Sequence, residues 1–257
     1  MKEIRHTPVA PTRTQHLVPG ASIDAHRHDD HQIVYAGRGT IAVTTVAGTW
    51  VTPATRAIWV PAGTVHAHQA HGRLELHLVG IPSGENPLGL DAPAVLGVGP
   101  LLRELIIAHA GAPEHESAEQ LRLRAVLLDQ LRLAPQQPLH LPTPSTRILA
   151  EVCDILRSDP ADGRSLAELG RQVGASDRTL SRMFRRDLGM TFTQWRTQLR
   201  LHHALVLLAD RTPVTSVAHQ CGWSSASTFI DVFRRTFGHT PGSHHAAVRK
   251  DFAPHRS

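Results

Sequence analysis

The last hundred or so residues of the chain contain an internal repeat, and a repeat of this kind permits few folds. Gly174 recurs 48 residues later as Gly222, and Phe184 recurs 49 residues later as Phe233. Each copy has the pattern of a short helix, a glycine turn and a second helix, which is typical of a helix-turn-helix unit. The change of offset indicates one inserted residue in the second turn. We therefore expect an all-helical C-terminal domain with two such units.

The second helix of the first copy has two faces. Leu180 and Phe184 fall on the apolar face. The opposite face holds, at helical spacing, Arg178, Ser181, Arg182 and Arg185. Arginine there can donate two hydrogen bonds to guanine or neutralise a phosphate. A helical stretch over 191–210 separates the copies. At about 1.5 Å per residue it would span roughly 30 Å, close to one turn of B-DNA.

The charge of the chain is uneven. Residues 145–257 carry 16 Lys and Arg against 10 Asp and Glu, whereas residues 1–144 carry 11 against 12. A basic, arginine-rich half is typical of a protein that binds a polyanion, most often nucleic acid. The alternatives are a solvated basic surface or a piece of a helical solenoid. Two units only, each with a glycine turn and an arginine face, favour DNA binding.

The C-terminal half resembles the AraC/XylS family of transcriptional regulators. The resemblance covers about residues 145–250 and is carried by LAELGRQVGASDRTLSRMFRRDLGMTFTQWRTQLRL and VTSVAHQCGWSSASTFIDVFRRTFGHTP. It implies base contacts by Arg178, Ser181 and Arg182 in the first unit. In the second unit it implies the same role for Ser225, Ala226, Ser227 and Asp231.

The second unit departs from the family pattern. Members often place a long polar or basic side chain where Ala226 and Asp231 stand. Asp231 can accept a hydrogen bond from cytosine N4, but it repels phosphate. Arg234, the repeat partner of Arg185, is the basic residue expected to contact DNA here. We therefore expect the first unit to dominate affinity.

The N-terminal part has a different period. Frequent Gly and Pro separate strand-like runs over 15–90, namely Gln32–Tyr35, Thr40–Thr45, Ala57–Val60 and Arg73–Val79, which indicates an all-β sandwich or barrel. Residues 99–110 and 117–133 have helical spacing, and Ser117 with Gln120 predicts a capping box. Four prolines within 134–144 predict a semi-rigid linker.

Histidines cluster in this N-terminal part. His26 and His28 are two residues apart in a strand region, so both point to one face, and Gln32 shares that parity. His66 follows Pro61 and Gly63. Three converging imidazoles could bind Zn²⁺, Ni²⁺, Fe²⁺ or Cu²⁺. Alternatively, they line an organic pocket as hydrogen-bonding groups. Four further histidines are expected at the surface or at the edge of a pocket, namely His31, His68, His71 and His77.

The spacing of these residues resembles the cupin superfamily over about 15–85. The first cupin motif, G-x5-H-x-H-x3-E-x6-G, is met by Gly20, His26, His28 and Gly39, with Gln32 in place of Glu. The second motif, G-x5-P-x-G-x2-H-x3-N, is met at its proline, second glycine and histidine, but Thr55 and Ala70 depart at its ends. The resemblance implies a β-barrel and a partial metal site, weakened by the missing carboxylate.

Together these patterns predict a two-domain α+β protein. We expect a cupin-like, effector-binding β-barrel over 1–92 and a helical packing or dimerisation segment over 93–133. The proline-rich linker over 134–144 then leads to the AraC-type DNA-binding domain over 145–257. The helices of 93–133 either pack on their own barrel or form a dimer contact.

The expected function is a sequence-specific regulator that binds an operator and is controlled by a small molecule in the barrel. A metal-responsive regulator is the second hypothesis, with a divalent ion as its candidate cofactor and effector. A metal-dependent cupin enzyme fused to a DNA-binding domain is the third, disfavoured by the missing Glu, and a structural nucleoid protein is the fourth. Expected partners are double-stranded DNA, the effector, a second copy of the chain, and RNA polymerase if the protein is an activator.

Other features exclude several classes of protein. Two cysteines, Cys153 and Cys221, are too few for a disulfide scaffold or a cysteine-rich zinc module. No run of 18 or more apolar residues occurs, and residues 1–16 lack the apolar segment of a signal peptide. We therefore expect a cytoplasmic protein without a membrane partner.

Overall fold

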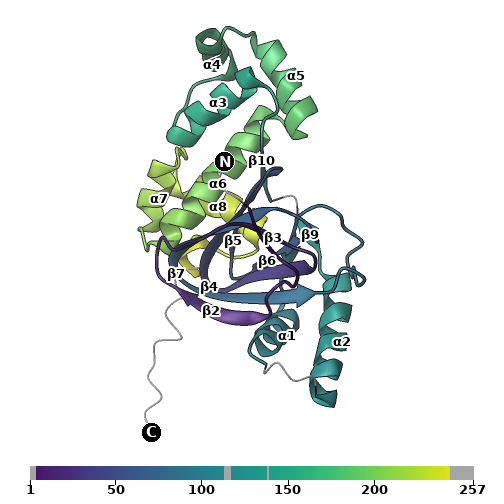
Figure 1. The fold of residues 1–257 in the computed structure, drawn as a ribbon. Helices are drawn as coiled ribbons and strands as arrows, with labels where there is room; N and C mark the ends of the chain where they lie inside the picture. Colours follow the sequence, from purple (N-terminus) through teal and green to yellow (C-terminus); the bar gives the residue numbers. More distant parts are fainter. Residues whose placement is uncertain (1–3, 113–116, 138, 244–257) are drawn as a thin grey trace. The chain divides into compact units, whose positions relative to one another are not determined.

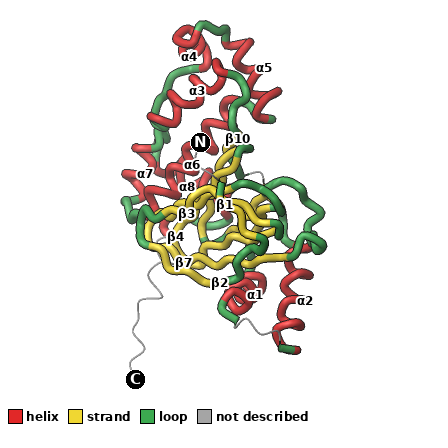
Figure 2. Tube along the Cα trace, in the orientation of Figure 1, coloured by secondary structure: helices red, strands yellow, loops and turns green. Residues whose placement is uncertain are grey.

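The structure is a computed structural model that describes residues 4–112, 117–137 and 139–243. It divides into two compact units at His140 and Leu141. The first unit is mainly strand and the second is helical (Figures 1 and 2). Pro138 of the predicted linker and residues 244–257 of the predicted DNA-binding domain lie outside the described residues.

The first unit is built around one antiparallel sheet that curls on itself (Figure 2). Its strands are β1 (Arg5–Thr7), β2 (Arg13–Leu17), β3 (Ser22–His28), β4 (His31–Thr45), β5 (Gly48–Pro53), β6 (Arg56–Val60), β7 (His66–Ile81), β8 (Ala94–Gly97) and β9 (Gln136–Gln137). The strand order is β1-β3-β7-β4-β6-β8-β9, with β2 paired to β7 and β5 paired to β4. Strands β1 and β3 pair in parallel, whereas the pairings of β7 with β2, β3 and β4 are antiparallel.

The long strands β4 and β7 form the centre of the sheet. The runs predicted as separate strands at Gln32–Tyr35 and Thr40–Thr45 are one strand, because the glycines between them lie in bulges and do not end the pairing. Gly39 has φ +84°, and a Cβ there would meet the backbone carbonyl of Arg73. Glycine at this position therefore permits the bend and the close approach of β7.

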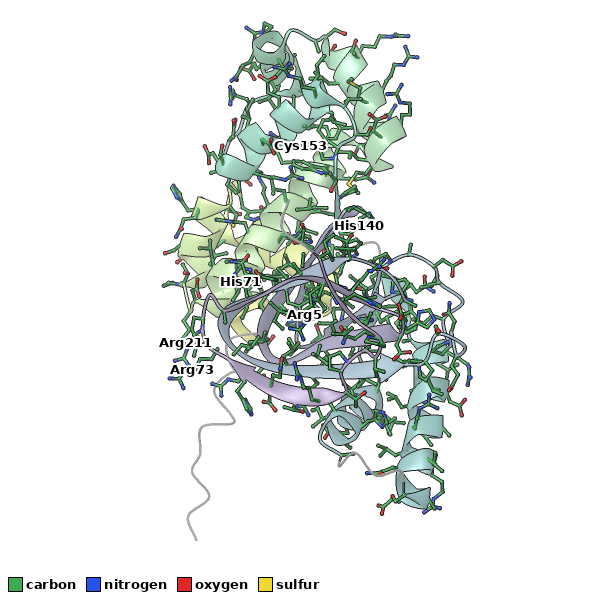
Figure 3. All side chains as sticks on the ribbon, viewed as in Figure 1. Arg5, His71, Arg73, His140, Cys153 and Arg211 are labelled. Atoms are coloured by element: carbon green, nitrogen blue, oxygen red, sulfur yellow. The ribbon has the colours of Figure 1, made fainter. Side chains whose placement is uncertain are left out.

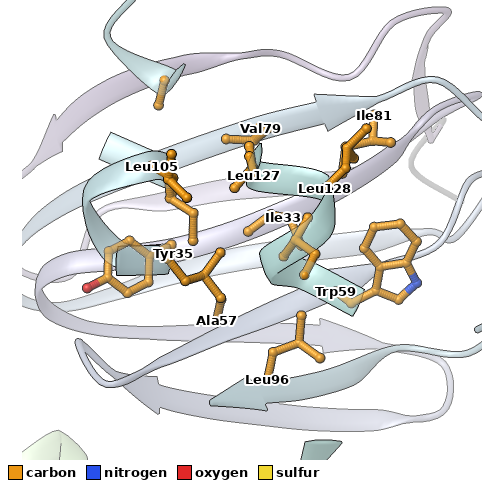
Figure 4. Close-up of a cluster of buried hydrophobic side chains, with 14 residues drawn as sticks. Ile33, Tyr35, Ala57, Trp59, Val79, Ile81, Leu96, Leu105, Leu127 and Leu128 are labelled. Carbon is orange, nitrogen blue, oxygen red and sulfur yellow. The ribbon is translucent and has the colours of Figure 1, made fainter. Parts of the chain in front are cut away.

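Two helices cover one face of the sheet, α1 (Pro100–Ala110) and α2 (Ala118–Leu133). The predicted capping box is confirmed, because the Ser117 hydroxyl accepts from Gln120 N and the Gln120 amide accepts from Ser117 N. The core between sheet and helices contains buried residues from both, including Ile33, Tyr35, Trp59, Val79, Leu105 and Leu127 (Figure 4). The apolar faces of α1 and α2 thus pack on their own sheet.

The sheet extends further along the chain than the predicted boundary at residue 92. Strand β8 pairs with β6, and β9, inside the predicted linker, pairs with β8. The Gly97 N–H also donates to the carbonyl of Pro135 at 2.8 Å. Proline is tolerated at such a sheet edge because its missing N–H faces away from the ladder.

The second unit consists of helices around two cores. Its elements are β10 (Leu141–Pro142), α3 (Arg147–Ser158), α4 (Leu166–Val173), α5 (Asp177–Leu188), α6 (Phe192–Ala209), α7 (Val214–Gln220) and α8 (Ala226–Phe237). The first core includes Cys153, which lies inside the helical unit (Figure 3), with Phe184 and Trp195. Phe229, Phe233 and Phe237 are buried in the other half of the unit.

Local capping explains where these helices begin and end. Ser176 caps α5, and Ser225 caps α8, each by accepting the N–H three residues ahead. Gly174 ends α4 with φ +72°, and Gly222 follows α7 with the same φ. The glycines are 48 residues apart and the caps are 49 apart, so the inserted residue lies in the second turn, as the repeat predicts.

Substitution of Gly170 in α4 separates helix propensity from packing. In an open helix, Gly→Ala gains about 0.5–1 kcal/mol. A Cβ at Gly170, however, would meet the backbone carbonyl oxygen of Ala175 in the turn. Overpacking of this kind costs about 1–3 kcal/mol. We therefore expect Gly170→Ala to lower the unfolding free energy, measured by urea denaturation.

The matched control is Gly163→Ala, because nothing lies within 4 Å of a Cβ built there. This variant should be as stable as the parent. Equal stability of the Gly170→Ala and Gly163→Ala variants would contradict the close packing of the turn against α4.

Candidate functional site

Three of the four predicted barrel residues meet at one place. His26 lies on β3 directly opposite His66 on β7, and His28 is two residues further along β3. The ring of His66 is 4.3 Å from that of His26 and 5.0 Å from that of His28, centroid to centroid. His28 and His66 are buried, whereas His26 is partly exposed.

Each of these rings is tied by its Nδ1 atom to a nearby backbone carbonyl. His26 bonds Asp24 at 2.8 Å, His28 bonds Asp30 at 2.7 Å, and His66 bonds Thr64 at 2.9 Å. A carbonyl can only accept, so Nδ1 carries the proton and Nε2 keeps its lone pair.

The candidate ligand atoms of the three rings all lie within 4.8 Å of one another. The Nε2 atoms of His28 and His66 are buried and have no hydrogen-bond partner among the described residues. Buried nitrogens are seldom left unpaired. Imidazoles held through their other nitrogen are the usual arrangement around a bound metal. The donor set therefore fits a divalent transition metal.

The electrostatics favour neutral rings at His66 and His26. Burial lowers the pKa of His66 to about 4, and burial also lowers the pKa of His26. Desolvation disfavours the imidazolium form of these two rings, and so does a second positive charge nearby. At neutral pH the lone pairs of His66 and His26 are free to bind without first losing a proton.

Gln32 is placed on β4, between Val60 of β6 and Gly80 of β7. It is fully buried, and neither atom of its amide has a partner among the described residues. The structure records no contact between Gln32 and the three histidines. A neutral amide thus occupies the position where the cupin motif has a carboxylate.

Like His31 and His77, His68 is buried and does not lie at the surface, but it lines the cavity described below, as the pocket-edge alternative predicts. His68 also belongs to this cluster. Only 3% of the residue is exposed, and its ring is 5.1 Å from that of His66 and 5.6 Å from that of His26. The signal was present, because His66 and His68 have the same strand parity. The burial comes from pairing with β3 and β4, which local sequence does not reveal.

A cavity of about 190 Å³ lies beside the cluster and reaches His26 and His68. Its wall also includes Ile23, Leu78 and Arg5. Arg5 lies opposite His26 across the β1–β3 pair, and Figure 3 labels it. The cluster can therefore be reached by a small solute from this side.

The predicted DNA-contacting residues of the first helix-turn-helix unit lie on α5. Arg178, Arg182 and Arg185 are exposed, and Ser181 is half-buried beside them. None of the ion pairs recorded for the described residues involves these three arginines. By contrast, Arg196 and Arg200 on α6 are half-buried and donate to the carbonyls of Arg164 and Pro160. Those two arginines hold the loop before α4 and are not free for a polyanion.

The second helix-turn-helix unit is less basic than the first, and two of its predicted DNA-contacting residues have local partners. Ser225 caps α8 through its hydroxyl oxygen. Asp231 pairs with Arg234 at 3.4 Å, and both side chains are more than half exposed. This pair offsets the repulsion between Asp231 and phosphate. Ser227 is exposed on the same helix. Weaker DNA binding by this helix-turn-helix unit stays a prediction.

The length and hydropathy of the helices bear on one further class, the membrane-spanning proteins. No helix in the described part of the chain has the length and hydropathy needed to cross a bilayer.

Both halves of the chain are similar to known protein families. A helix-turn-helix domain model matches residues 169–246, and a cupin domain model matches residues 13–82. The transcriptional regulator NimR of Escherichia coli K12 is 33% identical over 228 residues, which cover 87% of this chain and 82% of NimR. The arabinose operon regulatory protein of the same strain is 29% identical over 148 residues, 56% of this chain and 50% of that protein.

Among solved structures, ToxT from Vibrio cholerae is 10% identical with a TM-score of 0.41, covering 93% of this chain and 98% of that one. The family assignment depends on the sequence relatives and the two domain models. The N-terminal domain is of the cupin type, and the C-terminal domain is the DNA-binding domain of a transcriptional regulator. The chain therefore belongs to the AraC-type family of helix-turn-helix transcriptional regulators.

Proposed function

We propose that the regulator binds its operator through the exposed faces of α5 and α8. On α5 the contacts come from Arg178, Ser181, Arg182 and Arg185, and on α8 from Ser225, Ser227, Asp231 and Arg234. The observation that carries this proposal is the exposed, unpaired arginine face of α5. Base-edge contacts select the sequence, and arginine–phosphate contacts add salt-dependent affinity.

The same proposal assigns effector sensing to the barrel, at His26, His28 and His66, with Gln32 as the amide inside the barrel. A cavity of the barrel domain reaches His26 and His68, and an organic effector entering it would find ring nitrogens as hydrogen-bonding groups. Such an effector acts only through different affinities for the DNA-competent and DNA-incompetent states.

A second candidate is a metal-responsive regulator. It is favoured by the three Nδ1–carbonyl bonds, because an organic pocket does not require all three rings to be fixed with their lone pairs converging. His26, His28 and His66 would hold the ion, which would supply a Lewis-acidic centre for a further ligand.

The proposal also includes association of two copies of the chain and, for an activator, contact with RNA polymerase. Leu101 and Leu121 remain exposed on α1 and α2, although the other faces of these helices are buried. We expect them in a contact between two copies of the chain in the cytoplasm. If the regulator is an activator, RNA polymerase is the further partner.

The first experiment combines operator selection with elemental analysis. Random double-stranded DNA is enriched on the full chain, and the protein is purified without a chelator or metal-affinity tag. Near-stoichiometric metal, together with different operator affinity before and after chelation, supports the metal-responsive regulator. Metal-free protein whose operator affinity shifts with a small molecule from a thermal-shift screen supports the organic effector. Equal affinity for enriched and random DNA would contradict the sequence-specific regulator.

The Arg182→Ala variant tests base contact by α5. We expect it to lose about 1–3 kcal/mol of binding free energy on the enriched operator and much less on unrelated DNA. A fluorescence-anisotropy titration on both DNAs measures the difference. Arg147→Ala is the matched control, because it removes one exposed positive charge from α3, outside both helix-turn-helix units. Equal losses on both DNAs would reassign Arg182 to phosphate contact.

A further inference from the structure

The cavity beside the histidine cluster has a buried imidazole on its wall. His68 lines this cavity with only 3% of the residue exposed, and both of its ring nitrogens lack a hydrogen-bond partner among the described residues. Buried polar groups are nearly always paired, and leaving one unpaired is costly. An aliphatic or aromatic side chain would fill the same space without that cost. The imidazole therefore points to a polar group of a ligand as its partner.

The wall of the same cavity carries positive charge. Arg5 and Arg13 line it, together with one exposed carboxylate, that of Asp24, among the described residues. The Gln15 amide lies 2.7 Å from the Arg13 guanidinium. No hydrogen bond or ion pair recorded between described residues involves the guanidinium of Arg5, which is exposed and lies across the β1–β3 pair from His26. Arg5 is therefore the cation available to an anionic ligand that enters the cavity.

Apolar side chains form much of the remaining wall and limit the size of a ligand. They include Val9, Pro11, Ile23 and Leu78. Small-molecule sites are mostly apolar, with a few polar groups that fix the orientation of the ligand. An apolar cavity of about 150 Å³ accommodates benzene. This cavity of about 190 Å³ therefore has room for one six-membered ring with small substituents.

We infer that this cavity binds a small organic anion of one ring, with its carboxylate on Arg5 and a hydroxyl group on His68. The exposed guanidinium holds the carboxylate on the solvent side, and the buried imidazole bonds the uncharged end inside. The inference rests on the organic-effector form of the proposed function. It goes beyond that form by naming the chemical class of the effector and two residues, outside the three-histidine cluster, that select it.

The test uses 4-hydroxybenzoate, its neutral amide 4-hydroxybenzamide, and benzoate, which lacks the hydroxyl group. Each compound is titrated calorimetrically, at neutral pH, into full-length protein that has been treated with a chelator and dialysed. Arg5→Gln removes the cation, and His68→Phe removes the buried nitrogens but keeps a ring of similar size. Arg27→Gln is the matched control, because Arg27 is an exposed arginine of β3 outside the described wall of the cavity.

The first comparison tests the charge of the ligand. The parent should bind 4-hydroxybenzoate at least about 10-fold more tightly than 4-hydroxybenzamide, because the amide loses the charge-assisted bonds to Arg5. Arg5→Gln should remove this preference, and Arg27→Gln should keep it. Because Arg5 is exposed, its replacement should leave the melting temperature of the protein unchanged.

The second comparison tests the buried end of the ligand. The parent should bind 4-hydroxybenzoate about 10-fold more tightly than benzoate, because benzoate leaves the imidazole of His68 unpaired. His68→Phe should remove this second preference and keep the first. A residue with only a structural role would weaken the binding of all three compounds alike.

The outcomes against the inference differ in what else they remove. Equal binding of acid and amide by the parent, or preferences that survive in Arg5→Gln or His68→Phe, would overturn the assigned contacts. If the parent binds none of the three compounds while an uncharged molecule from the thermal-shift screen shifts operator affinity, the chemical class is wrong and the organic-effector form stands. If no molecule from that screen shifts operator affinity either, the organic-effector form fails together with the inference.

Discussion

Replacing both His26 and His66 by alanine should abolish the response of operator binding to its effector while leaving metal-free operator binding at the parent affinity. The two rings face each other at 4.3 Å and contribute two of the three converging donors. Their loss leaves His28 as the only motif donor. If the effector is a metal, its affinity should fall by more than about 100-fold, because loss of a single outer-sphere partner alone costs about 10–100-fold.

The measurement is operator affinity with and without the effector, paired with elemental analysis of the purified variant. His16→Ala again provides the control, since this exposed histidine lies outside the cluster. The helix-turn-helix units belong to the other compact unit, so their intrinsic affinity should be unchanged. A double variant that still responds like the parent would remove the effector site from the histidine cluster.

The second large effect is expected from the paired core phenylalanines of the repeat. Phe184 and Phe233 are fully buried at equivalent positions of the two units. Truncation of a buried Phe to Ala costs about 3–5 kcal/mol. This is a large share of the roughly 5–15 kcal/mol by which most domains are stable. In each alanine variant, the helix-turn-helix unit that carries the substitution should therefore unfold at a much lower urea concentration than in the parent, as circular dichroism would show.

The two variants should differ in DNA binding although they cost similar stability. Because α5 carries the unpaired arginines and α8 carries the Asp231–Arg234 pair, Phe184→Ala should lose more operator affinity than Phe233→Ala. Phe184→Leu is the matched control and should lose much less stability, since most of the buried volume remains. A larger loss of affinity from Phe233→Ala would show that the second unit dominates binding.

The helical half was predictable because its signals are local. The glycines, the serine caps and the apolar spacing of α4, α5, α7 and α8 all lie within about ten residues of the feature they determine. The repeat then supplied a second, independent copy of each signal. Even the extra residue in the second turn follows from the change in spacing, without any knowledge of tertiary contacts.

The barrel was less predictable because its strands depend on distant partners. Gly37 and Gly39 suggest a break, but pairing with β7 carries β4 through both positions. His68 has the parity of a clustered residue, yet its burial requires the neighbouring strands. The short strand β9 inside the proline-rich segment exists only because β8 offers it an edge. In each case the free energy comes from residues remote in sequence.

The difference between the exposed side chains of α5 and α8 has a consequence for how an operator is oriented in the genome. Two DNA-binding elements related by a two-fold axis select a palindromic site, which is the same in both orientations along the duplex. If α5 and α8 both contact the operator as proposed, their different side chains select two unlike half-sites in a fixed order. Inverting such an operator would turn the bound chain around relative to the promoter. We therefore expect the orientation of the operator, as well as its spacing, to affect regulation.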